Sequence, residues 1–264
     1  MSERRVAVKI AYLGKLFSGS QIQPGLYTVE GQVVSDLLTT GDGRPEEWFD
    51  LKVSSRTDAG VNSYGNVIVF NTAFNDNESL LRALNAVSKN VFYLAIADVD
   101  KDFNPRYADS RTYLYRITCK DADIGRMREC AEIFRGRHDF KRFCKYDGKP
   151  TETELTSVRV LESENGIFLE FKSRYFLWNM IRRISSAIIE VGRGRAEVSD
   201  VKEVLDGREG NFGLGQADAL TLTEVTYNTI EFIEYGSEPL RNRSERLFES
   251  ARMETEFYGH MCRY

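Results

Sequence analysis

The alternation of apolar and polar residues along the chain predicts the same series of strands and helices twice. Side chains on one face of a strand recur every second residue, whereas the apolar face of a helix recurs every third or fourth residue. On these spacings the first half runs strand, helix, strand, strand, helix, strand over residues 5–12, 28–40, 51–55, 65–70, 77–87 and 91–99. The second half repeats that order over residues 111–119, 124–134, 154–161, 167–173, 176–191 and 219–227, with a short extra helix over 199–205.

This repeated order is typical of ferredoxin-like units in tandem, an α+β fold that RNA-recognition modules share. We therefore expect one ferredoxin-like half over residues 1–108 and a second over residues 109–235. The halves show no sequence identity to each other, so this expectation depends on element order alone. Residues 236–264 stand apart as a helical extension that packs on the body or on a second subunit.

The charge of the chain is unevenly distributed. The formal net charge is −4, yet residues 101–195 carry 20 Lys and Arg against 14 Asp and Glu, while the remainder carries 16 against 26. A basic surface of this kind suits a phosphate backbone. Solvated charge on ordinary helix faces explains the same numbers equally well.

Several kinds of protein are disfavoured by what the sequence lacks. The longest purely apolar run, residues 91–97, is far shorter than the ~20 residues that span a bilayer, and the N-terminus has no apolar segment of a signal peptide. We therefore expect no membrane partner and a cytoplasmic location. Because no P-loop or Rossmann fingerprint is present, no nucleotide cofactor is expected. The cysteines and histidines match no common metal spacing, so no metal is expected either.

Residues 54–70 contain the most informative candidate for chemistry. Arg56, Thr57, Asp58 and Gly60 lie in a loop between two expected strands. Asp and Gly are frequent turn residues, so a β-turn accounts for Asp58 and Gly60 without any chemistry. A nearby arginine favours the ionised form of a carboxylate, and an ionised carboxylate suits a nucleophile. The residues alone leave both interpretations open, with the turn favoured.

In two further segments the sequence leaves open whether the side chains bind RNA or fill a core or surface. Alternation places Arg111, Tyr113 and Tyr115 on one face of the strand that opens the second half. Aromatic rings on such a face either stack on RNA bases or fill a core. In the long helix of the second half, Arg182 projects on the side that also carries Trp178, which indicates partial enclosure, although solvent exposure is slightly favoured by periodicity alone.

A series of sequence blocks occurs in a characteristic order along residues 6–227. The block Ser-Arg-Thr-Asp-Ala-Gly-Val-Asn-Ser-Tyr-Gly-Asn occupies residues 55–66. The other blocks cover residues 12–23, 28–31, 102–115, 138–140, 176–184, 191–194 and 217–222. Together they resemble the TruA-type tRNA pseudouridine synthases. The chain departs from the family pattern at Ser20, Asn62 and Asn66, where the family has tryptophan, histidine and glutamine.

The resemblance implies a fold, a reaction and partners. The halves are expected to join into one extended, mainly antiparallel sheet, with helices on one face and a catalytic cleft on the other. The expected activity is isomerisation of uridine to pseudouridine in the anticodon stem-loop of tRNA, at positions 38–40, without a cofactor. A relative that acts on other RNA positions and a catalytically silent RNA-binding protein of the same fold are the alternatives. tRNA is the expected partner, and two subunits are expected to form a homodimer.

The resemblance also assigns roles to individual residues. Asp58 matches the family nucleophile, and Arg182 matches the arginine that pairs with it. Tyr113 matches the active-site tyrosine, which stacks on the base and is placed to take part in proton transfer. The residues expected to bind substrate are Arg56, Thr57, Arg111, Tyr113 and Leu220.

Overall fold

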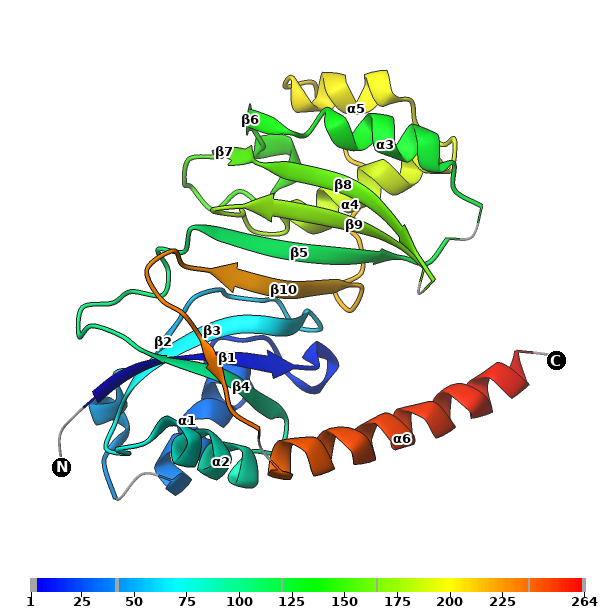
Figure 1. The fold of residues 1–264 in the computed structure, drawn as a ribbon. Coiled ribbons are helices and arrows are strands. Elements are labelled where there is room, and N and C mark those ends of the chain that lie inside the picture. Colours follow the sequence, from blue (N-terminus) through cyan, green and yellow to red (C-terminus); the bar gives the residue numbers. More distant parts are fainter. Residues whose placement is uncertain (1–3, 41–42, 120, 165, 237, 263–264) are drawn as a thin grey trace.

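The computed structural model describes residues 4–40, 43–119, 121–164, 166–236 and 238–262 of the chain (Figure 1). The strands are β1 (Arg4–Tyr12), β2 (Lys52–Val53), β3 (Asn62–Thr72), β4 (Val91–Asp98), β5 (Ser110–Ile117), β6 (Gly136–Asp139), β7 (Glu152–Leu155), β8 (Ser157–Ser163), β9 (Gly166–Ser173), β10 (Leu220–Thr226) and β11 (Ile233–Glu234). The α-helices are α1 (Val29–Thr40), α2 (Asn77–Val87), α3 (Ile124–Glu132), α4 (Met180–Gly192), α5 (Val198–Leu205) and α6 (Glu238–Met261).

One large sheet runs through the described part of the molecule. Its strands follow the order β11-β4-β1-β3-β10-β5-β9-β8, and β2 pairs with β3 beside this path. The neighbours along the path are antiparallel except β3 and β10, which are parallel. The expectation of a mixed α+β protein with an extended, mainly antiparallel sheet is therefore confirmed.

The first half packs α1 and α2 against β1, β3 and β4. Its core includes Val6, Val8 and Ile10 from β1, together with Val33 and Leu37 from α1. The strand residues alternate along the chain, and the helix residues are four apart. Both spacings turn one apolar face of each element inward, which explains why the periodicity located these elements.

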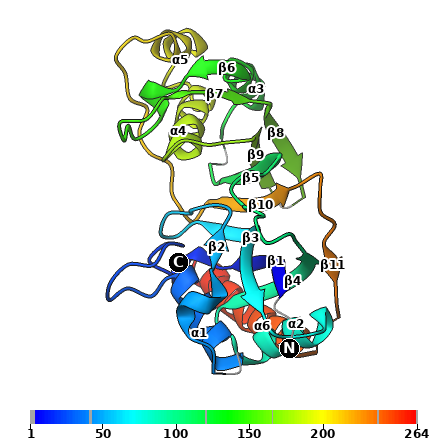
Figure 2. The same cartoon turned by 90° about the vertical axis from the view of Figure 1, so that its left-hand side faces the viewer.

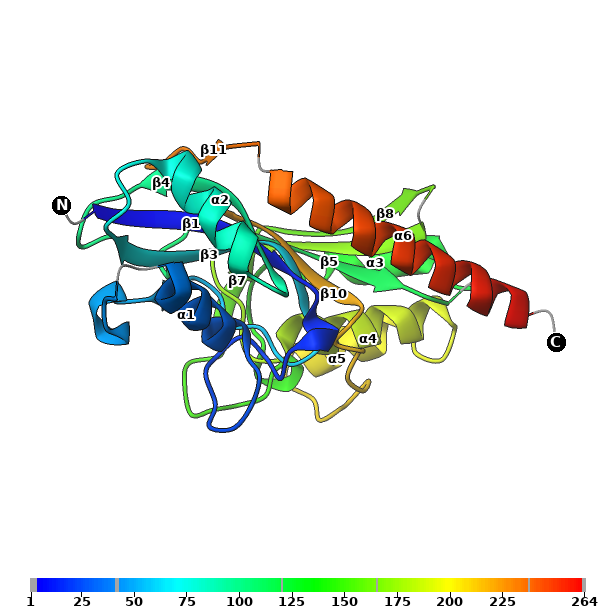
Figure 3. The ribbon, with the colours of Figure 1, turned by 90° about the horizontal axis from the view of Figure 1, so that it is seen from below.

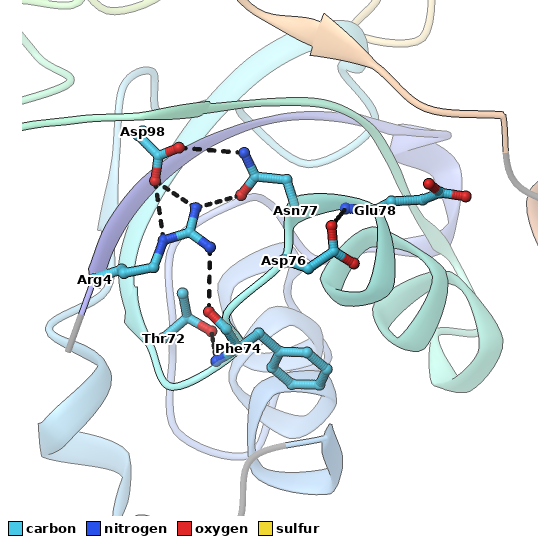
Figure 4. Close-up of polar contacts among 7 residues, drawn as sticks. All are labelled: Arg4, Thr72, Phe74, Asp76, Asn77, Glu78 and Asp98. Atoms are coloured by element: carbon cyan, nitrogen blue, oxygen red, sulfur yellow. Dashed lines mark hydrogen bonds and ion pairs between the residues drawn. The ribbon is translucent and has the colours of Figure 1, made fainter. Parts of the chain in front are cut away.

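A polar cluster fixes the start of α2 beside the sheet (Figure 4). The Asp76 carboxylate caps the helix and accepts hydrogen bonds from the backbone N–H of Ser79 at 2.7 Å and of Glu78 at 3.4 Å. Arg4 at the beginning of β1 donates to Asn77 Oδ1 at 2.6 Å and to Asp98 Oδ1 at 3.1 Å. The beginning of β1, the end of β4 and the first turn of α2 are thus tied together.

The second half packs α3 and α4 against β5, β8 and β9. Leu169 and Phe171 of β9 share a core with Ile184 and Ile188 of α4 and with Met127 of α3. Figure 2 shows this half stacked on the first through the neighbouring strands β10 and β3.

Side chains lock the parallel junction between the halves. Thr221 lies opposite Asn62, and Leu222 lies opposite Ser63. The Ser63 hydroxyl donates to the Leu222 carbonyl at 3.2 Å. At Gly65 an added Cβ would lie 2.5 Å from the Thr223 carbonyl oxygen, so only glycine permits this approach. The junction holds the loop that precedes β3 in a fixed position relative to the second half.

The structure adds β6 and β11, starts β3 earlier than predicted, and differs from individual predicted elements in the following ways. The strand predicted over 51–55 is only Lys52–Val53, because the backbone N–H and carbonyl of Ser55 bond to the buried Asn66 side chain. The strand predicted over 154–161 is divided between β7 and β8, which belong to different sheets; β7 pairs with β6. The helix predicted over 176–191 begins only at Met180, because Asn179 has a left-handed backbone with φ 61°.

The extension after the second half is a long helix, as predicted, but only its beginning contacts the body. Arg243 donates to the Val91 carbonyl at 2.7 Å and to the Ser88 carbonyl, and its guanidinium lies 4.0 Å from the centre of the Phe92 ring. No described residue of α6 is buried. The helix runs outward beyond the strands (Figure 3). Large apolar side chains are exposed along it, among them Leu247, Phe248, Met253, Phe257 and Tyr258.

Candidate active site

The loop that carries Asp58 is a tight turn held by its own backbone and by Ser20. The Val61 N–H donates to the Asp58 carbonyl at 3.1 Å, and Gly60 takes a positive φ of 86°. Ser20 bonds to Thr57 twice: its N–H donates to the Thr57 carbonyl at 3.0 Å, and its hydroxyl accepts from the Thr57 N–H at 2.8 Å. The turn interpretation is therefore confirmed for the backbone, and the carboxylate is left available for another role.

Asn66 fixes the loop from within the sheet. It is fully buried, and its side-chain amide donates to the Ser55 carbonyl at 2.9 Å and to the Tyr12 hydroxyl at 3.2 Å. Its carbonyl oxygen accepts from the N–H groups of Ser55 at 3.2 Å and Val67 at 2.9 Å. The Asn66 side chain thus takes up the Ser55 N–H and carbonyl, which would otherwise pair with a neighbouring strand and extend the short strand β2.

Arg111 supports the same loop from the neighbouring strand. Although it is charged, it is 8% exposed. It donates to the Ser55 hydroxyl at 2.9 Å, to the Ser54 carbonyl at 3.2 Å and to the Arg106 carbonyl at 2.9 Å, and it also bonds to the Arg174 carbonyl. These contacts all lie inside the protein and position the loop, while a contact with substrate stays a prediction.

The Asp58 carboxylate is held between Trp178, which precedes α4, and Arg182, which lies in the first turn of that helix. Arg182 Nη1 lies 3.3 Å from Asp58 Oδ2, so the expected pairing is confirmed, and Trp178 Nε1 donates to Asp58 Oδ1 at 3.2 Å. Arg182 is itself held, because its Nε donates to the Gly215 carbonyl at 2.8 Å. The Arg182 side chain is only 16% exposed, whereas that of Asp58 is 36% exposed. The cation is therefore enclosed, and the carboxylate is open on one side.

Tyr113 is a buried aromatic side chain that packs against the segment before α4. It is 7% exposed, and its ring meets that of Phe176 edge-on with 5.2 Å between centroids. Burial raises the pKa of the Tyr113 hydroxyl well above its usual range, and the neighbouring Tyr12 raises it further. The phenol is therefore neutral at physiological pH and can donate a hydrogen bond.

The remaining predicted residues differ in their surroundings. Thr57 is buried, and its hydroxyl shares a hydrogen bond of 2.8 Å with the Tyr12 hydroxyl. Leu220 is buried at the beginning of β10, opposite Tyr115 of β5. Arg56 is exposed at the surface of the loop. The structure thus brings Asp58 and Arg182 into direct contact, and Arg111 holds the Asp58 loop. The roles of Arg56, Thr57 and Leu220 toward a substrate stay predictions.

The candidate residues lie close to helices of both halves. Arg182 belongs to α4, and Tyr113 shares a core with Ile181 of that helix. Tyr12, which contacts Thr57, shares a core with Val33 of α1. The expectation of a catalytic cleft on the face of the sheet opposite the helices stays a prediction.

Sequence reasoning missed Trp178 and Lys145 as parts of the site. Trp178 was placed on the side of Arg182 but received no role. Lys145 Nζ lies 3.7 Å from the centre of the Trp178 ring, and its N–H donates to the Trp178 carbonyl at 2.8 Å. The four-residue spacing of Trp178 and Arg182 was the available signal for Trp178. No local pattern pointed to Lys145.

The described ranges contain no candidate membrane span and no candidate metal site. None of the helices described combines the length and the apolar character that a membrane crossing needs. Among the same residues, no group of three or more His, Cys, Asp or Glu side chains is arranged to hold a metal ion.

Comparison with known proteins identifies the family. A family profile described as tRNA pseudouridine synthase matches residues 130–228. The tRNA pseudouridine synthase A of Pyrococcus abyssi is 35% identical over 251 residues, which cover 93% of this chain and 90% of the relative. The enzymes of the same name from Archaeoglobus fulgidus and Methanobrevibacter smithii are 35% and 30% identical, covering 91% and 87% of this chain and 91% and 86% of the relatives.

Likeness to solved structures is slight by comparison. A chain of a Cbf5-Nop10-Gar1 complex aligns with a TM-score of 0.34 at 12% identity, covering 70% of this chain and 45% of that one. The sequence relationship is far closer and extends over almost the whole length. The chain belongs to the tRNA pseudouridine synthase A family of RNA-modifying isomerases.

Proposed function

We propose that this protein converts uridine to pseudouridine in the anticodon stem-loop of tRNA, at positions 38–40, with Asp58 as the nucleophile. The observation that carries the proposal is the Asp58 carboxylate, half open to solvent and bonded to the enclosed Arg182 at 3.3 Å. A carboxylate that is paired with a guanidinium and still partly exposed can act as a nucleophile toward a bound nucleotide. Family membership supplies the reaction class.

The reaction breaks the bond between uracil N1 and ribose C1′ and makes a bond between C5 and C1′. Asp58 attacks C1′ or assists elimination of the base, and uracil then rotates before C5 is joined to the sugar. The proton lost from C5 is balanced by a proton gained at N1, so the isomerisation needs no external oxidant or reductant. The Arg182 guanidinium stabilises the carboxylate before attack and after its release.

Tyr113, Leu220 and Arg56 take the roles of a pocket around the extruded base. Burial keeps the Tyr113 phenol neutral, which suits stacking on uracil and donation or relay of a proton. Leu220 is an apolar wall residue. Arg56, which is exposed beside the turn, fills the place in the RNA stack that the uridine leaves. Thr57 and Arg111 complete the set by holding the loop, and through it the sugar, in position.

The tRNA is held beside the site by the basic segment between β6 and β7. Lys141, Arg142, Lys145 and Lys149 are all exposed there, and Lys141 Nζ lies 5.4 Å from the centre of the exposed Tyr146 ring. Cations and an exposed aromatic ring in one segment suit a phosphate backbone and an unstacked base. Binding through this segment weakens as the salt concentration rises.

Two copies of the chain form the active unit, and each copy consists of two ferredoxin-like halves and an extension. The order β4-β1-β3-β2 in the first half and β10-β5-β9-β8 in the second supports the repeated unit. The apolar side chains exposed on α6 support the homodimer, because exposed apolar surface of this extent marks interaction sites. The protein works in the cytoplasm, where tRNA is modified.

The test is a map of pseudouridine in tRNA transcripts after incubation with the protein and with Asp58→Ala. We expect product at positions 38–40 with the native chain and none with the variant. Asp58→Asn is the matched control, because it keeps the shape and the acceptor oxygen but removes the charge, and it should also give no product.

The other outcomes separate the alternatives. Product only at other positions keeps the chemistry and rejects the substrate assignment. Tight tRNA binding without any product identifies a silent RNA-binding protein. Product from Asp58→Ala rejects the nucleophile.

A further inference from the structure

Trp178 gives the Asp58 carboxylate a second hydrogen-bond donor besides Arg182. Its Nε1 is 3.2 Å from Asp58 Oδ1, while Arg182 Nη1 is 3.3 Å from Oδ2. Each carboxylate oxygen therefore has one donor, and the two donors come from opposite ends of the group. Such a pair fixes the plane of the carboxylate as well as its position.

The backbone around Trp178 holds the indole in place. Asn179 has φ 61° and ψ 5°, a left-handed conformation that asparagine tolerates better than most residues. This residue lies between Trp178 and the first turn of α4, and its side chain also accepts from Arg182 Nη1 at 3.3 Å. Trp178 and Arg182 therefore reach the same carboxylate from a single rigid corner of the chain.

Lys145 lies over the face of the Trp178 ring and strengthens the indole N–H as a hydrogen-bond donor. Its ammonium lies 3.7 Å from the centre of the Trp178 ring, and its backbone N–H donates to the Trp178 carbonyl at 2.8 Å. A cation over the ring face draws electron density from the indole, which makes its N–H a better donor. The ammonium does not touch the carboxylate itself, so the effect reaches Asp58 only through Trp178.

We propose that Trp178, supported by Lys145, is a positioning residue that orients the Asp58 carboxylate for reaction at the sugar; this rests on the proposed role of Asp58 as the nucleophile. A neutral N–H is suited to the task, because a second cation on the carboxylate would reduce its nucleophilicity. Arg182 stabilises the negative charge of the carboxylate, and Trp178 fixes its orientation. Trp178 is 47% exposed, so its position depends on these contacts and not on burial in a core.

Trp178→Phe removes the indole N–H and keeps an aromatic ring under Lys145. We expect the single-turnover rate constant with saturating enzyme to fall about tenfold to a hundredfold, the size of effect that misplacement of a reacting group produces. The dissociation constant for tRNA should change less than twofold. Lys145→Met should lower the rate constant in the same direction by a smaller factor. Trp48→Phe is the matched control, because the chain has only one other tryptophan, and it should be unchanged.

An isosteric replacement separates the N–H from the shape of the ring. In the Trp48→Phe chain, Trp178 is the sole tryptophan, so a tryptophan-auxotrophic host can replace it with β-(3-benzothienyl)alanine, which has sulfur in place of N–H. The rate constant should fall as it does in Trp178→Phe, with an unchanged melting temperature. In the same background, Asp58→Asn should shift the Trp178 fluorescence emission, because the contact with the carboxylate changes.

Three results of these experiments would overturn the proposal. A rate constant within twofold of wild type in either replacement overturns the proposal, as does a loss confined to tRNA affinity, which would make Trp178 an RNA contact. An emission spectrum that does not respond to Asp58→Asn also overturns it. If Asp58→Ala still forms product, the proposed nucleophile fails instead, and the emission shift still reports whether the two side chains meet.

Discussion

Replacing Arg111 with methionine should loosen the loop that presents Asp58. Arg111 is buried in β5 and donates to the Ser55 hydroxyl at 2.9 Å, to the Ser54 carbonyl at 3.2 Å and to the Arg106 carbonyl at 2.9 Å. Methionine fills a similar length of space but donates nothing. The variant therefore isolates the hydrogen bonds from the packing.

The size of the effect follows from two opposing contributions. A hydrogen bond from a charged donor is worth about 1.5–3 kcal/mol, and an acceptor left buried without a partner costs about 1–3 kcal/mol. Against this, methionine removes the cost of burying a cation. We expect the free energy of unfolding to fall by about 3 kcal/mol, which lowers the melting temperature by ~6–12 °C in a chain of this size.

The assay is urea unfolding of Arg111→Met beside a matched control on a nearby strand. Arg159 of β8 is also paired, with Glu170 at 2.6 Å, but its side chain is 61% exposed. Arg159→Met should change the unfolding free energy by less than about 1 kcal/mol. Activity of Arg111→Met should fall even at temperatures where the variant is folded, because the Asp58 loop loses support. Equal urea midpoints for the two variants would refute this account of the loop.

Two other predictions concern pH and the C-terminal helix. Burial raises the pKa of Tyr113 above its ordinary value of 10.0, so the stability it contributes is complete below pH 10 and is lost as the pH rises beyond that value. Between pH 9 and pH 11 the wild type should lose about 1.4 kcal/mol more unfolding free energy than Tyr113→Phe, measured by urea titration, and equal losses would contradict the buried phenol. A chain ending after Ser244 keeps the Arg243 anchor and should stay folded, because the rest of α6 buries nothing within one copy of the chain. Light scattering should show its mass halved relative to the native dimer, and a monomeric native chain would contradict the proposed homodimer.

Much of the fold was predictable because its elements obey simple periods. In β1, Val6, Val8 and Ile10 alternate inward, and α1 places Val33 and Leu37 four residues apart on one buried face. The predicted boundaries were wrong where hydrogen bonds from individual polar side chains determine the backbone conformation. The strand predicted over 51–55 ends early because the backbone of Ser55 bonds to a buried amide instead of a neighbouring strand.

Less of the site could be predicted from the sequence. Asp58 and Arg182 are separated by 124 positions, and no local period relates them. Their pairing was expected only from the family pattern. The indole donor was missed because Trp178 precedes α4, where the left-handed Asn179 changes the direction of the chain. Helical spacing put Trp178 on the correct side but could not say that its N–H reaches a carboxylate.

The three departures from the family pattern form hydrogen bonds with the backbone around the Asp58 turn. The Ser20 hydroxyl accepts from the Thr57 N–H at 2.8 Å, and the Asn66 amide donates to the Ser55 carbonyl at 2.9 Å. Asn62 accepts from the Gly14 N–H at 2.9 Å and donates to the Asp218 carbonyl at 2.9 Å.

All three side chains are shorter than those they replace, and each of these hydrogen bonds goes to a nearby backbone group. They therefore help to set the shape of the turn from inside. We expect discrimination between uridines to depend on side chains that are exposed beside the turn, foremost Arg56.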